Sequence, residues 1–149
     1  MFRVKLNIDP EAILLAHGLN DGGAAQRHLT ETVNKRITAY MPYRSGALSG
    51  KLKRVTSPSE ITISAPYARY QYYGKVMIDP AINAAGFLTK DGTWRSRKGA
   101  VKVLTARSLT YDTTKNAKAG PYWDRRLMAA EGKAIVADLQ EFIKARDRK

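Results

Sequence analysis

Cysteine is absent from this chain of 149 residues, and long apolar runs are absent too. Without cysteine there can be no disulfide, no thiolate metal ligand and no cysteine nucleophile. No stretch approaches the roughly 18 apolar residues of a membrane span. The opening MFRVKLNI alternates apolar and polar residues and lacks the continuous apolar run of a signal peptide. The sequence therefore predicts a soluble intracellular protein with no membrane partner.

Histidine and clustered acids are also scarce. His17 and His28 lie eleven residues apart, whereas two ligands on one helical face need a spacing of four. The acids are scattered singly, and helix capping explains Asp9 and Glu11 better than acid–base chemistry does. The glycines of NDGG lack the lysine and hydroxyl of a phosphate-binding loop. We therefore expect no enzyme activity, no metal and no cofactor.

Positive charge is what the chain has in excess. It carries 26 Lys and Arg against 13 Asp and Glu, a net charge of +13 with a pI of about 10.1. Such a field favours nucleic acid, an anionic membrane surface or an acidic protein as the partner, and says nothing about the fold.

Two helices are predicted in the first part of the chain. A chain of this length fits a single domain over 1–149, because it can bury about 68–70% of its unfolded surface. After a period-two strand over 2–8, Asp9 as N-cap and Pro10 at the first helical position predict a short helix. Apolar residues at helical spacing predict an amphipathic helix over 23–40, which Pro42 ends.

The remaining predicted elements are strands, followed by a long final helix. ALSGKLKRV (47–55) and ITISA (61–65) predict a hairpin, and AVKVL (100–104) predicts a further strand. A helix is predicted from Pro121 onward, in which four apolar residues share one face: Met128, Ile135, Leu139 and Phe142. Gly132 on it indicates either close approach of another element or a cost of up to about 1 kcal/mol in helix propensity. The fold class is α+β, with a small, mostly antiparallel sheet packed against two long helices.

A basic stretch lies within 77–116, which we expect to be an extended loop or hairpin insertion. Its candidate partner-facing or DNA-facing residues are Lys90, Trp94, Arg95, Arg97, Lys98, Lys102 and Arg107. Basic side chains around an aromatic ring can bind the phosphate backbone of a nucleic acid while the ring stacks on a nucleobase. The alternative is a solvated loop whose tryptophan packs on its own domain. No standard reader motif is present, so any DNA contact should be non-specific.

Four of the eight tyrosines gather in PYARYQYYG, residues 66–74. A helical turn would place Tyr67, Tyr70 and Gly74 on one face. This cluster would then form a structural hinge between sheet and loop and a subunit contact, since tyrosine is enriched at interfaces. The alternative places Tyr67 and Tyr70 in the core, with Tyr72 and Tyr73 covering the sheet edge.

Three segments in order carry a family resemblance: YMPYRSGALSGKL (40–52), APYARYQYYGKV (65–76) and AGPYWDRRLMAAEGKAIV (119–136). Together they resemble the minor capsid and neck proteins of tailed bacteriophages. The residues that match the family pattern are Pro42, Ser45, Gly46, Leu48, Pro66, Tyr67, Ala68, Tyr70, Gly74, Gly120, Pro121 and Trp123.

The resemblance implies a structural virion protein of the head-to-tail connection, forming a homo-oligomeric ring between the portal and adaptor layers and the tail. Its implied partners are the head-closure or adaptor protein and the tail terminator, with non-specific contact to packaged DNA. The protein would be assembled in the bacterial host cytoplasm and reside in the virion. The competing hypothesis is a free, sequence-nonspecific nucleic-acid-binding protein.

Overall fold

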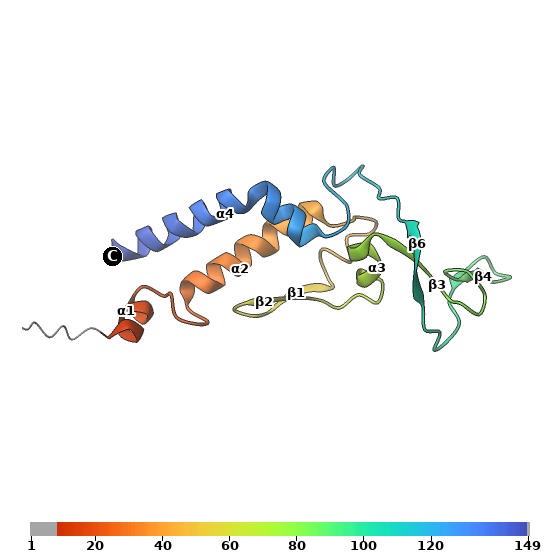
Figure 1. The fold of residues 1–149 in the computed structure, drawn as a ribbon, viewed down its shortest axis with the longest axis horizontal. Helices are drawn as coiled ribbons and strands as arrows, with labels where there is room; N and C mark the ends of the chain where they lie inside the picture. The colour runs from red at the N-terminus through yellow and green to blue at the C-terminus, as the bar shows by residue number, and fades with distance from the viewer. Residues whose placement is uncertain (1–8, 149) are drawn as a thin grey trace, which may run out of the picture.

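The computed structural model describes residues 9–148, which form an elongated molecule with the long helices toward one end and most of the strands toward the other (Figure 1). We call residues 9–41 and 117–148 the helical half, and residues 42–116 the β half. The chain is α+β, as predicted. The strand predicted over 2–8 lies outside the described residues.

The first two helices lie where the sequence predicts them. Helix α1 (Pro10–Ala16) starts at Asp9, whose carboxylate accepts hydrogen bonds from the backbone N–H groups of residues 11 and 12 at 3.1 and 3.2 Å. Helix α2 (Ala24–Ile37) continues into the 3₁₀ turn η1 (Thr38–Tyr40). Met41 is then extended, because the proline that follows disfavours helical backbone at the preceding residue.

Helix α4 (Trp123–Asp147) lies antiparallel beside α2, and the core forms mainly between them (Figure 1). Its buried members are Ile37, Tyr40, Met41, Leu48, Trp123, Leu127 and Ile135. The predicted face of α4 was wrong in one respect, because Met128 is half exposed and Leu127 is fully buried instead. A Cβ at Gly132 would meet only Met128 Cε, at 3.5 Å. No close approach requires this glycine, so its effect is on helix propensity.

Within residues 9–148 the strands form three separate two-stranded antiparallel sheets instead of the single sheet predicted. Strands β1 (Lys53–Ser57) and β2 (Glu60–Ile63) form a hairpin against α2. Strand β3 (Lys75–Ile78) pairs with β6 (Val103–Ser108), and β4 (Phe87–Leu88) pairs with β5 (Trp94–Arg95). Helix α3 (Ala68–Tyr73) separates the first sheet from the second along the chain.

Two strands begin later than the sequence predicted. The segment 47–52 is coiled into a turn, in which the N–H of Gly50 donates to the carbonyl of Gly46 at 2.9 Å, and β1 starts only at Lys53. Leu48 is therefore a core residue of a turn and not of a strand. Strand β6 starts at Val103, where its register with β3 begins.

Candidate assembly interface

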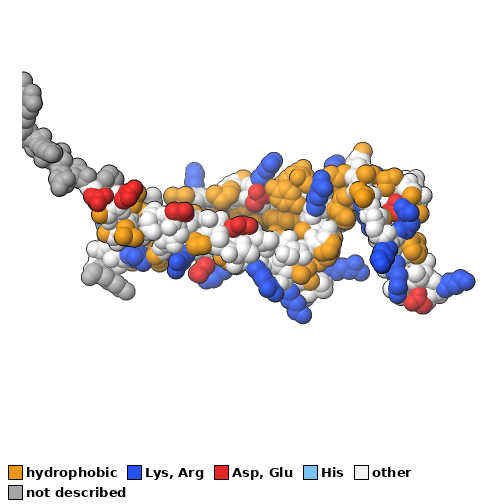
Figure 2. Space-filling model, turned by 90° about the horizontal axis from the view of Figure 1, so that it is seen from below, with side chains coloured by type: hydrophobic (Ala, Val, Ile, Leu, Met, Phe, Trp, Pro, Cys, Tyr) orange, Lys and Arg blue, Asp and Glu red, His pale blue; other side chains and the backbone are white. Residues whose placement is uncertain are grey.

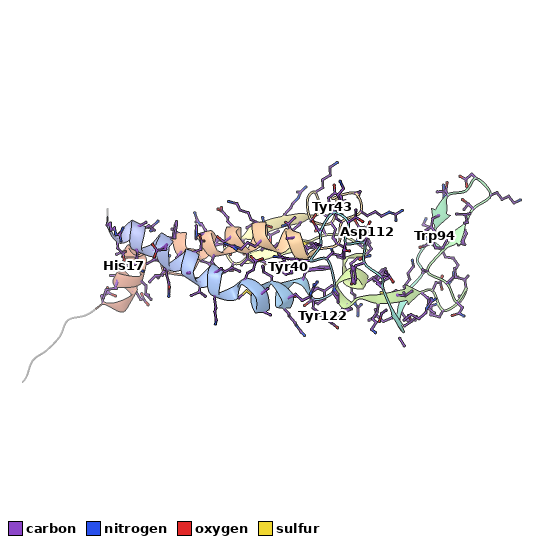
Figure 3. All side chains as sticks on the ribbon, turned by 90° about the horizontal axis from the view of Figure 1, so that it is seen from above. His17, Tyr40, Tyr43, Trp94, Asp112 and Tyr122 are labelled. Carbon is purple, nitrogen blue, oxygen red and sulfur yellow. The ribbon has the colours of Figure 1, made fainter. Side chains whose placement is uncertain are left out.

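Residues 75–108, here called the arm, project from the helical half (Figure 1). The β3–β6 ladder forms the base of the arm, and the β4–β5 hairpin lies further along it. Lys75 pairs with Ser108, and the N–H of Leu109 donates to the carbonyl of Gly74 at 2.9 Å. The chain therefore enters and leaves the arm at adjacent points. Trp94 lies far from Tyr40 and Tyr122 of the helical half (Figure 3).

An ion pair between a buried carboxylate and a half-exposed guanidinium holds the arm together. The side chain of Asp79 is 3% exposed, and Arg97 donates to both of its carboxylate oxygens, from Nε at 2.6 Å and from a terminal nitrogen at 2.8 Å. These hydrogen bonds lower the pKa of Asp79 below its ordinary value. Lys102 adds a second link through the carbonyl of Ala85 and the hydroxyl of Ser96. Two of the seven residues predicted to face a partner are thus also engaged inside the arm.

The arm has almost no core of its own. Met77 is its only buried large apolar side chain, whereas Leu88 is 65% exposed, Trp94 61% and Val101 81%. One edge of the Trp94 indole lies against Gly86, where a Cβ would come within 2.8 Å of the ring nitrogen. The tryptophan therefore packs within the arm and not on the helical half, and most of its surface stays available.

Positive charge is concentrated in the β half. Residues 42–116 carry 13 Lys and Arg against four Asp and Glu, whereas the described residues of the helical half carry ten against nine. On the arm, Lys90, Arg95, Lys98 and Arg107 are exposed, and none forms an ion pair within residues 9–148. Figure 2 shows Lys and Arg along the arm, with most of the acidic side chains in view over the helical part.

The three segments that carry the family resemblance meet at the junction between the two halves. The Tyr72 ring packs edge-on against Trp123 and Tyr122, with centroids 5.1 and 5.3 Å apart. The N–H of Tyr122 donates to the carbonyl of Tyr72 at 2.8 Å. A Cβ at Gly74, which is left-handed at φ +65°, would come within 2.9 Å of Pro121 Cβ. The second and third segments therefore interlock sterically at the base of the arm.

A carboxylate joins the first segment to the third. Glu131 of α4 accepts from Tyr40 Oη at 2.8 Å, from Arg36 at 2.8 Å and from Lys118 at 3.1 Å. These donors, Arg36 first, lower the pKa of Glu131 to about 2. The N–H of Gly120 also donates to the carbonyl of Tyr40 at 3.3 Å. The end of α2 is thus tied to the beginning of α4 beside the core.

The structure corrects the interpretation of the tyrosine cluster in which Tyr67 and Tyr70 are core. Tyr67 is 39% exposed and Tyr70 is half-buried, whereas Tyr72 packs against the core and donates its hydroxyl to Asp124 at 2.8 Å. The other residues of the family pattern divide between core and surface. Trp123 and Leu48 are core, Gly120 is buried, Ala68 packs against the core, Pro121 is half-buried, and Pro66 and Ser45 are exposed.

A groove of about 780 Å³ opens at the junction. It is lined by residues 42–48, Tyr67, Gln71 and residues 110–112. Two of these lining residues, Tyr43 and Asp112, are labelled in Figure 3. Tyr111 donates its hydroxyl to the carbonyl of Gln71, and burial raises its pKa. The family pattern contains Pro42, Ser45, Gly46, Leu48 and Tyr67 of this lining, although the sequence did not group them as a groove. It missed Tyr111 and Asp112, because no spacing links them to segments that lie forty or more residues earlier.

Both histidines contact carboxylates within the helical half. His17 contacts Asp147 at 2.6 Å, and His28 contacts Asp138 at 2.7 Å while its ring stacks on Phe142. Within residues 9–148, no three His, Cys, Asp or Glu side chains are grouped to hold a metal ion. None of the helices there combines the length and apolar character needed to cross a bilayer.

No protein-family profile, curated protein or solved structure matches this chain.

Proposed function

We propose that this protein is a structural, non-enzymatic subunit of the head-to-tail connection of a tailed phage or prophage, assembling as a ring between the portal or adaptor layers and the tail. The observation that supports this most directly is the arm. It exposes Leu88, Trp94 and Val101 beside unpaired basic residues, and it buries only one large apolar side chain.

An arm of this composition is suited to a partner surface. Large apolar side chains clustered on a projection expose apolar surface to water, which is unfavourable in a monomer, and such patches mark interaction sites. Tryptophan and arginine are enriched at such interfaces, and the arm exposes one of each, Trp94 and Arg95. A ring also needs two different surfaces on each subunit, because its contacts are heterologous. The arm supplies one such surface, and the groove at residues 42–48 is a second concave one.

The junction supports the proposal independently of the arm's surface. The three segments that resemble phage neck proteins are distant in sequence, yet they contact one another around Tyr72, Trp123 and Tyr40. Their packing sets the direction in which the arm leaves the helical half, through the contact of Gly74 with Pro121. A subunit that joins neighbouring layers requires such a fixed direction.

The test is quantitative mass spectrometry of purified particles from the phage or prophage that carries this gene. A small, fixed number of copies per major capsid subunit is the expected result. In parallel, replacing Leu88 and Trp94 by Ser should leave the circular dichroism spectrum unchanged and block the joining of heads and tails. Val136→Ser, on an exposed position of α4, is the matched control. Absence of the protein from particles would contradict the proposal.

A second function, as a free nucleic-acid-binding protein, is favoured by the charge of the β half and by the exposed Trp94 next to Arg95. Because phosphate neutralisation releases counterions, binding should weaken steeply with added salt. The measurement is fluorescence anisotropy with duplex and single-stranded DNA at several salt concentrations. Purified protein that fails to bind either at low salt would remove this candidate.

A further inference from the structure

We infer that the arm of one copy docks on helix α1 of a second copy, so that subunits join end to end. This inference rests on the proposed function only for its biological setting, because the contact itself can be tested with the purified chain. Two features carry it: each end of the molecule exposes apolar side chains, and the charges around these two apolar surfaces have opposite sign.

Within residues 9–148, helix α1 is a second apolar element that lacks a partner. Every residue from 11 to 16 is exposed, and the large side chains among them include Leu14 at 44% and Leu15 at 64%, followed by Leu19 at 45%. The helix is nevertheless held in place. The N–H of Leu19 donates to the carbonyl of Leu14 at 2.8 Å, and His17 contacts Asp147 at the end of α4. Its leucines therefore form a positioned apolar surface that nothing in the described chain covers.

The charges around the two surfaces are complementary. Residues 9–31 carry four acids, Asp9, Glu11, Asp21 and Glu31, and one base, Arg27. Arg146 of α4, whose guanidinium lies 3.2 Å from the Cβ position of Gly18, adds a second positive charge beside α1, so these side chains together still have an excess of acids. The arm carries seven Lys and Arg against two acids, one of which is already paired with Arg97. Like charges would oppose contact between two arms, whereas opposite charges favour the arm and α1 over that symmetric pairing.

The two surfaces must belong to different copies. They lie at opposite ends of the elongated molecule, with the paired helices between them (Figure 1). The arm and α1 are different patches, so their contact is heterologous, and repetition generates a closed ring or an open filament. This is the kind of contact that a ring of subunits requires, and it leaves the groove at the junction free for another component.

Site-directed cross-linking tests the contact, and the absence of cysteine makes the chain suited to it. Leu15→Cys and Leu88→Cys are made as separate single variants of the full chain, mixed and treated with a short bismaleimide. The 15–88 pair should form several-fold faster than the 15–15 or 88–88 pair. Equal rates for all three pairs, or a dominant 88–88 pair, would overturn the inference.

Charge reversal separates docking from random collision. Replacing Arg95 and Lys98 by Glu in the Leu88→Cys chain should reduce the 15–88 yield to that of the symmetric pairs. Replacing Glu11 and Asp21 by Lys in the Leu15→Cys chain should restore the yield when the two reversed chains are mixed. Restoration is not expected if the reversals merely unfold the arm. If the 15–88 pair forms in solution but the protein is absent from particles, the contact stands and the phage role fails.

Discussion

Between α2 and α4 the apolar side chains face one another, whereas along the arm most of them face solvent. The helical half has a contiguous core and nearly balanced charge. The β half has strongly positive charge and depends on hydrogen bonds, on the Asp79–Arg97 ion pair and on packing at the junction. The difference teaches that the two halves are stabilised by different forces, so that a substitution in one need not affect the other in the same way.

The largest effect is expected in the shared core. Leu127→Ala removes a fully buried side chain and leaves a cavity, so it should lower the free energy of unfolding by about 2–5 kcal/mol. Met128→Ala, at the neighbouring half-exposed position, is the control and should cost much less. Urea denaturation followed by circular dichroism measures both. Equal losses for the two variants would contradict the assignment of the buried face.

The second effect should be confined to the arm. Arg97→Ala leaves the buried carboxylate of Asp79 without its bidentate partner, and a buried charge without a partner is strongly unfavourable. Amide hydrogen exchange within residues 75–108 should accelerate by about tenfold or more, while α2 and α4 are unchanged. Arg95→Ala, which removes an exposed and unpaired base, should leave exchange as it is. Faster exchange in both halves would mean that they do not open separately.

A third test uses acid. Glu131 has a pKa of about 2 in the folded protein against 4.5 as its ordinary value, so it stabilises the fold fully above pH 4.5. That contribution is lost as the pH falls from 4.5 to about 2. In Glu131→Gln this part of the pH dependence should disappear from the midpoint of thermal unfolding. Amide hydrogen exchange in the arm near neutral pH should be similar in the wild-type protein and in Glu131→Gln. An unchanged acid profile would show that Glu131 does not link the helices as described.

The smallest effect is a gain in stability. Gly132→Ala adds a methyl group that meets only the flexible end of Met128, and alanine has a better helix propensity by up to about 1 kcal/mol. The free energy of unfolding should rise by about 0.5–1 kcal/mol in urea. A loss of stability would mean that the backbone of α4 approaches another element at this point.

The helices could be predicted because their signals are local. Asp9 caps α1 through its own neighbours, and the apolar spacing of α2 needs no knowledge of the rest of the chain. The strands could not be placed as well, because their limits depend on pairing. Strand β6 begins where β3 offers a partner, and 47–52 coils although its composition allows a strand.

The site was predictable in composition but not in arrangement. The sequence shows the basic residues and Trp94, yet nothing in it links Arg97 to Asp79. That pair forms only through the tertiary structure, between residues 18 positions apart. The exposure of Leu88 and Val101 was likewise invisible, since an apolar residue in a strand pattern is ordinarily expected to be buried.

The adjacency of Gly74 and Leu109 makes the arm a separable module. Because the chain leaves and rejoins the helical half at one place, residues between these two points can be added, removed or replaced without changing the distance that the remaining protein must span. Evolution could thus change the partner that the arm binds while the helical half stays the same. A protein engineer could insert a different hairpin between the same two positions.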